Sequence, residues 1–165
     1  NSETTDEIVA IDTATHAVVG NWPIKPAEGA SGLALDVANH RLYAVTDKLM
    51  AVVDSTSGKL LSTFPIGAGP DAAAYDPGTG LIFASNSDST MTIAKSNATG
   101  TLTLVQTLAT PARSRTMTLD PKTHRVYIAA AEYGAPGAPG ANGQPGRPAI
   151  VAGSFKVVVY EMAGK

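Results

Sequence analysis

The sequence predicts an all-β fold, a partial β-propeller, because an internal repeat recurs about every 40 residues and short strands alternate with turn residues. Three segments share one pattern, in which an apolar run ends in aspartate and a second apolar run begins five residues later. They are Ser31–Asp36 with Arg41–Val45, Asp71–Asp76 with Leu81–Ser85, and Arg115–Asp120 with Arg125–Ala129. The closing aspartates are 40 and 44 residues apart.

A second pair of apolar runs lies between these segments. Its copies are Ile8–Asp12 with Ala17–Val19, Met50–Asp54 with Lys59–Leu61, and a degenerate pair at Met91–Ala94 and Leu102–Val105. Each repeat therefore holds four short strands at roughly ten-residue spacing, with no helical pattern between them. Four-strand repeats of this length are typical of propeller blades.

The repeat divides the chain into blades, whose strands we name A to D outward from the propeller axis. Residues 1–24 supply strands C and D of one blade, 25–66 and 67–110 form two complete blades, and 111–165 form the last blade with a Gly/Pro-rich loop at 134–154. This gives about three to three and a half four-stranded antiparallel blades. Propellers usually contain four to eight, so we expect another chain or a further segment to complete the ring.

Composition agrees with this fold class and excludes several functions. The 165 residues are 44% hydrophobic and only 16% charged, with 16 glycines and 11 prolines. A formal charge of −2 makes nucleic acid an unlikely partner. The chain has no cysteine and no apolar run long enough to span a membrane. We find no catalytic or metal-binding motif and expect no cofactor.

The turns between strands carry the clearest local signal. Asp36, Asp76 and Asp120 occupy one repeated position, where an aspartate side chain caps a tight turn. His40 and His124 take the place of Gly80 in these turns, and His16 takes the place of Gly58. Histidine tolerates positive φ better than most residues, so we interpret the three histidines as turn residues rather than ligands.

Several motifs together resemble the YVTN-repeat, YncE-like bacterial β-propellers. They are Gly69-Pro70-Asp71, Asp76-Pro77-Gly78-Thr79, Asp120-Pro121-Lys122-Thr123, Val53-Asp54 and Phe64-Pro65-Ile66-Gly67. The chain resembles the C-terminal half of such proteins. Since the similar members are exported, the resemblance implies a periplasmic or extracellular location.

The entrance to strand A is the candidate ligand site, because the innermost strands line the channel and their ends form its rim. Ser31, Asp71 and Arg115 occupy equivalent positions there, with Arg113 two residues before Arg115. Two guanidinium groups at a channel mouth could hold a carboxylate or phosphate. The competing interpretation is that these arginines pair with Asp71 or Glu132 across blades.

An open arc of blades leaves two uncovered sheet faces and two free strand edges, at Ile8–Asp12 and Phe155–Met162. Exposed apolar faces and unpaired edges favour association. We therefore expect another protein chain as partner, either a second copy or a complementary propeller half.

The loop sequence from residue 134 to 148 consists of five consecutive Gly-X-Y triplets, the collagen period. We interpret it as an extended, polyproline-like excursion between strands B and C of the last blade. A collagen-like trimer is the alternative.

Two classes of function follow. The leading hypothesis is a non-catalytic binding or scaffolding module of the bacterial cell envelope or exterior. The alternative is a fragment of a propeller enzyme or redox protein, of the lactonase, quinoprotein or haem d1 type, whose axial site requires the full ring.

Overall fold

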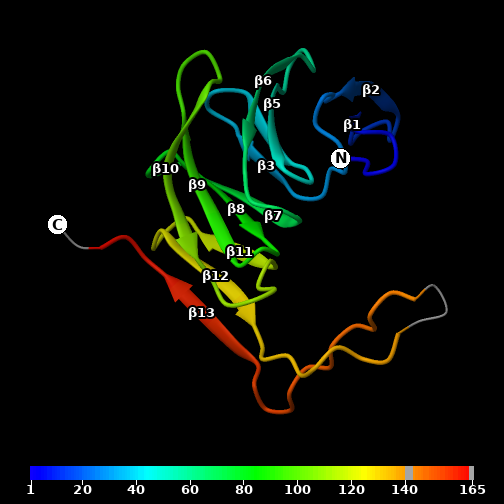
Figure 1. Cartoon of the computed structure of the whole chain (residues 1–165). Coiled ribbons are helices and arrows are strands. Elements are labelled where there is room, and N and C mark those ends of the chain that lie inside the picture. The colour runs from blue at the N-terminus through cyan, green and yellow to red at the C-terminus, as the bar shows by residue number, and fades with distance from the viewer. Residues whose placement is uncertain (140–142, 164–165) are drawn as a thin grey trace.

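The computed structural model describes residues 1–139 and 143–163, and this part of the chain forms thirteen strands in four antiparallel sheets (Figure 1). The first sheet contains β1 (Glu7–Ile11) and β2 (Val18–Pro23). The second contains β3 (Leu33–Asp36), β4 (Arg41–Val45), β5 (Leu49–Asp54) and β6 (Leu60–Pro65). The third contains β7 (Pro70–Asp76), β8 (Leu81–Asn86), β9 (Thr90–Ser96) and β10 (Leu102–Ala109). The fourth contains β11 (Met117–Asp120), β12 (Arg125–Ala130) and β13 (Lys156–Tyr160).

Each sheet is a meander in which consecutive strands pair. The first strands of the last three sheets lie side by side, since β3 contacts β7 and β7 contacts β11. These strands mark the propeller axis, and the sheets fan out from it as blades in an open arc (Figure 1). The predicted partial propeller is confirmed. No helix that could cross a membrane occurs in the described part of the chain.

The hydrophobic core lies between the blades. The first interface buries Ile8 and Ile24 against Leu42 and Val53. The second buries Tyr43, Met50 and Val52 against Ile82 and Ala94. The third buries Phe83, Met91 and Ile93 against Val126 and Ile128. Each complete blade is therefore apolar on both faces, and alternate residues of one strand belong to different cores.

Side-chain caps define the turns between strands A and B. Asp36 accepts hydrogen bonds from the Asn39 amide and side chain. Asp76 and Asp120 each accept from the amide two residues ahead and from the hydroxyl of a threonine three residues ahead. The predicted capping role is confirmed for all three aspartates. Asp12, Asp54 and Asn97 cap the turns between strands C and D in the same way.

The turn histidines are also confirmed as left-handed residues. His16, His40 and His124 have φ values of 56°, 52° and 59°, while the equivalent Gly58 and Gly80 have 71° and 70°. These backbone angles are costly for most side chains, so the glycine–histidine exchange reflects turn geometry.

Asp54 provides a pH-dependent test of the caps. Hydrogen bonds from the Thr56 hydroxyl and the Ser57 amide, with smaller effects of the Thr56 amide and Ser57 hydroxyl, hold the pKa of Asp54 well below its usual value. The cap therefore stabilises the fold above about pH 4 and is lost as the pH falls through the lowered pKa. We expect Asp54→Ala to lower the melting temperature at pH 7 by about 2–4 °C.

The difference between Asp54→Ala and wild type should shrink as the pH falls below about 4. Asp47→Ala is the matched control, because no hydrogen bond or ion pair of the Asp47 carboxylate occurs within the described residues. Thermal unfolding followed by circular dichroism measures both. A difference that stayed constant from pH 7 to pH 2 would contradict the capping role.

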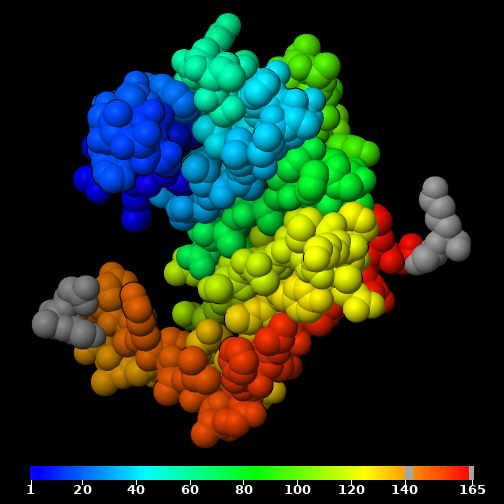
Figure 2. All heavy atoms as spheres, turned by 180° about the vertical axis from the view of Figure 1, so that it is seen from behind, coloured from blue at the N-terminus to red at the C-terminus, as the bar shows by residue number. Residues whose placement is uncertain are grey.

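The connection between β12 and β13 spans residues 131–155, and its described residues, 131–139 and 143–155, form an extended arm that projects away from the sheets (Figures 1 and 2). It lies between strands B and C of the last blade, where the sequence places the excursion. Its two limbs run antiparallel, with bridges between Tyr133 and Ile150 and between Gly137 and Gly146. The excursion therefore lies where the sequence places it, and its two limbs contact each other at these bridges. Residues 140–142 of the predicted 134–154 loop lie outside the described residues.

Candidate functional site

Ser31, Arg113 and Arg115 lie in the connections that lead into β3 and β11, and Asp71 is the second residue of β7. These four predicted rim residues do not form a single cluster. The Ser31 hydroxyl donates to the Pro70 carbonyl at 2.9 Å, so it joins two successive blades. Asp71 and Arg115 join the next two blades, with 3.9 Å between Oδ1 and Nη1. The Thr116 hydroxyl donates to Asp71 Oδ2 at 3.1 Å. Arg115 thus has the carboxylate partner that the competing interpretation expects.

Arg113 occupies a different environment from Arg115. Its backbone has a φ of 59°, within a turn closed by a hydrogen bond from the Ser114 amide to the Pro111 carbonyl. The guanidinium carbon lies 5.6 Å from the centre of the Tyr133 ring. The positive φ therefore directs Arg113 to the base of the arm rather than to Asp71.

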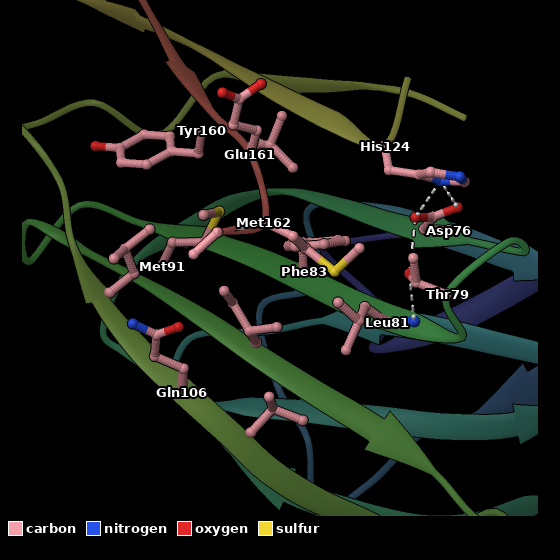
Figure 3. Close-up of a pocket in the computed structure, with 15 residues that line it drawn as sticks. Asp76, Thr79, Leu81, Phe83, Met91, Gln106, His124, Tyr160, Glu161 and Met162 are labelled. Atoms are coloured by element: carbon pink, nitrogen blue, oxygen red, sulfur yellow. Dashed lines mark hydrogen bonds and ion pairs between the residues drawn. The ribbon is translucent and has the colours of Figure 1, made fainter. Parts of the chain in front are cut away.

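A cavity of about 380 Å³, which we call the outer groove, lies between the third and fourth blades (Figure 3). Its lining is mainly apolar and comes from strands of both blades. The lining includes Leu81, Phe83, Met91, Ile93, Val105, Leu108, Val126, Tyr160 and Met162. The Tyr160 hydroxyl donates to the Ala109 carbonyl at 3.4 Å, and burial raises the pKa of Tyr160.

One end of the outer groove is polar (Figure 3). His124 Nδ1 lies 2.9 Å from Asp76 Oδ2 and 3.1 Å from Oδ1. The Asp76 side chain is only 1% exposed and also caps its own turn through Gly78 and Thr79. His124 therefore connects two blades in addition to its role in a turn, a contact that the sequence did not predict.

The outer groove is open because the fourth blade has three strands within the described residues. In the preceding interfaces, the outermost strand of the following blade adds a leucine to the core, Leu60 in the first and Leu102 in the second. The third interface has no equivalent strand beside β13 in this part of the chain. The groove thus marks the position that a fourth strand would occupy.

The fourth blade also has one uncovered face, which we call the open face: Tyr127, Ala129, Val157 and Val159. The strand registers of the last three blades place these sets at equivalent positions: Tyr43, Met50 and Val52; Phe83, Met91 and Ile93; Tyr127, Val157 and Val159. The first two sets are at most 8% exposed, whereas Val157 and Val159 are 54% and 48% exposed. The open face therefore has the apolar composition of a buried blade face, but no following blade packs against it within the described residues.

The histidines do not gather into a metal centre. Within residues 1–139 and 143–163, no group of three or more His, Cys, Asp or Glu side chains is placed to hold a metal ion. His16, His40 and His124 belong to separate turns.

The fold resembles solved β-propellers. A chain of the Kuenenia stuttgartiensis hydrazine synthase superposes with a TM-score of 0.71 and 14% identity, over 90% of this chain and 44% of that chain. A chain of the mitotic checkpoint complex superposes with a TM-score of 0.63 and 16% identity, over 76% of this chain and 40% of that chain. This chain thus spans less than half the length of either, and at these identities the likeness establishes the fold alone. No family model matches the sequence, and comparison with curated proteins gave no match.

Proposed function

We propose that this chain is a non-catalytic binding and scaffolding propeller module of the bacterial cell envelope or exterior, and that it associates with another propeller chain through its last blade. The YVTN-like motifs around Pro70, Asp76 and Asp120 support the bacterial, exported assignment. The observation that carries the proposal is the open face. Its residues match, position by position, two sets that the neighbouring blades bury.

The repeat itself indicates what covers the open face. In the second and third interfaces, Tyr43 and Phe83 are covered by strand B residues of the following blade, Ile82 and Val126. Tyr127 is the next residue in this series. The partner is therefore a blade of the same type, with an aliphatic residue at the position of Ile82 and Val126. A complementary propeller half would supply it. A second copy would instead bring its two-stranded first sheet, β1 and β2, against the open face.

The outer groove provides a second contact for the same partner. The outer edge of β13 has no neighbouring strand within the described residues, and an unpaired edge is a template for strand addition. A partner strand paired with β13 would direct alternate side chains toward Phe83 and Leu108, as Leu102 is directed into the preceding core. Association would thus add the fourth strand to the last blade and also bury its open face.

Val157→Lys tests this function. Burying a valine side chain contributes about 1.5–3 kcal/mol, and a lysine in its place would bring an unpaired charge into the contact. We expect the wild-type chain to sediment at micromolar concentration as a particle larger than 16.8 kDa. Val157→Lys should weaken this association about 100-fold.

Val37→Lys is the matched control, because Val37 is 71% exposed in a turn away from the open face. Sedimentation velocity over a concentration series measures all three proteins. A monodisperse wild-type monomer would exclude a second copy as the partner, and equal association of Val157→Lys and Val37→Lys would exclude the open face as the contact.

A further inference from the structure

The arm is an insertion in one blade only. The connections between strands B and C span residues 46–48 in the second sheet and 87–89 in the third, but residues 131–155 in the fourth. Insertions into a repeat fold concentrate on the face that binds ligands, and long connections in compact folds are usually functional. The length of the arm therefore favours a binding site at its base.

A cleft of about 430 Å³ lies at the base of the arm, and we call it the arm-base cleft. The turn before β11 lines one side, and the start of the arm with the first residue of β13 lines the other. The lining residues are Pro111, Ala112, Arg113, Ala131, Glu132, Tyr133 and Lys156. They include two cationic side chains, one carboxylate and one aromatic ring, with small apolar residues between them. The formal charge of the cleft is +1.

Arg113 differs from Arg41, Arg115 and Arg125 because its guanidinium has no carboxylate partner among the described residues. Arg41, Arg115 and Arg125 each lie within 4 Å of a carboxylate, on Asp54, Asp71 and Glu161 respectively. In the described part of the chain, the Arg113 guanidinium makes no hydrogen bond or ion pair, and it lies against the Tyr133 ring. The Glu132 carboxylate lines the same cleft but is not within ion-pair distance of Arg113 or Lys156. The hydrogen-bond donors of the Arg113 guanidinium are therefore available to bind a ligand.

The backbone of Arg113 adopts a conformation that is energetically unfavourable for arginine. The φ of Arg113 is 59°, which is unfavourable for arginine, and glycine, asparagine or histidine occupies such positions more readily. No ion pair within the described residues accounts for an arginine there. A ligand that uses the guanidinium would account for it.

We propose that the arm-base cleft binds a carboxylate attached to an apolar group. Arg113 would take the two carboxylate oxygens in its planar fork, which matches carboxylate geometry, and Lys156 would add a second positive charge. The apolar group would lie against Tyr133 and Pro111, which line the same cleft. The same chemistry is present in a free organic acid and in the carboxyl terminus of a polypeptide. The cleft is built from this chain alone, so the proposal does not depend on the partner proposed above.

Three small probes test the cleft. 3-Phenylpropionate represents a free organic acid, N-acetylphenylalanine a polypeptide terminus, and N-acetylphenylalaninamide the same terminus without its charge. Ligand-observed NMR titration at low salt measures their dissociation constants. We expect saturable binding of one or both acids, at least about 10-fold weaker binding of the amide, and weaker binding of the acids as salt is added.

The variant Arg113→Asn separates binding from folding, because asparagine tolerates positive φ and the turn should form without strain. We expect it to bind the acids about 10- to 100-fold more weakly than wild type, with an unchanged or raised melting temperature. Arg115→Gln is the matched control, since Arg115 is paired with Asp71, and it should bind as wild type does.

The acid that binds identifies the source of the carboxylate, and binding of either supports the proposal. The proposal is overturned if neither acid binds up to about 10 mM. It is also overturned if the amide binds as tightly as the acids, or if Arg113→Asn binds as wild type does.

Discussion

Replacing Phe83 by alanine is expected to lower the free energy of unfolding by about 4 kcal/mol. Phe83 is 6% exposed and lies in the core between the third and fourth blades, next to Met91 and Val126. Its truncation removes a large apolar surface from this core and enlarges the outer groove, which Phe83 also lines. Urea denaturation followed by circular dichroism measures the change.

Tyr127 is the matched control for Phe83, because it occupies the same repeat position on the open face. Tyr127→Ala should lower the free energy of unfolding by less than about 1.5 kcal/mol, because no blade in the described part of the chain covers the Tyr127 side chain. Both substitutions are made in the Val157→Lys chain, so that association does not contribute. Equal losses for the two positions would show that the open face is covered within a single chain, and the proposed association surface would be wrong.

Gly32→Ala is expected to lower the free energy of unfolding by about 3 kcal/mol, because the added methyl group crowds the backbone of the next blade. A Cβ atom on Gly32 would lie 2.6 Å from the Ala73 nitrogen and 2.9 Å from two backbone atoms of Ala72. These atoms belong to β7, the inner strand of the next blade, and they cannot rotate away as a side chain can. The two blades would have to separate near the axis.

The control for Gly32 is Gly134→Ala in the arm, where the nearest heavy atom to the added Cβ is the Ala149 carbonyl oxygen at 3.7 Å. This is an ordinary contact, and the change should be within about 0.5 kcal/mol of zero. Unfolding free energies from urea denaturation compare the two variants. A loss at Gly32 as small as that at Gly134 would contradict the close approach of β3 and β7.

The blades could be predicted from sequence because their signals are local. Asp36, Asp76 and Asp120 cap turns through residues two or three positions ahead, and His40 and His124 adopt the left-handed angles of the glycine they replace. The limits of the strands were predicted less accurately. The expected end strands Ile8–Asp12 and Phe155–Met162 are Glu7–Ile11 and Lys156–Tyr160 in the structure, because a strand ends where its hydrogen-bonded partner ends, and a local pattern does not specify that partner.

The sites could not be predicted in the same way, because they depend on how neighbouring blades meet. His124 and Asp76 are 48 residues apart, and their contact follows from the rotation between two sheets. Arg113 and Arg115 look alike in sequence, but the left-handed backbone at Arg113 turns it toward Tyr133. For the arm-base cleft, the sequence offered two signals, Arg113 as a candidate ligand residue and the length of the connection between β12 and β13, but not their proximity.

The placement of every core between sheets has a further consequence for cooperativity. No blade can bury an apolar face alone, so the stability of each blade depends on its immediate neighbours, as in a one-dimensional array with nearest-neighbour coupling. The two inner blades have two such couplings each, while the first and last blades have one. Opening fluctuations should therefore begin at the ends of the arc. A bound partner would suppress them at the last blade, and so would couple recognition to the order of β11, β12 and β13.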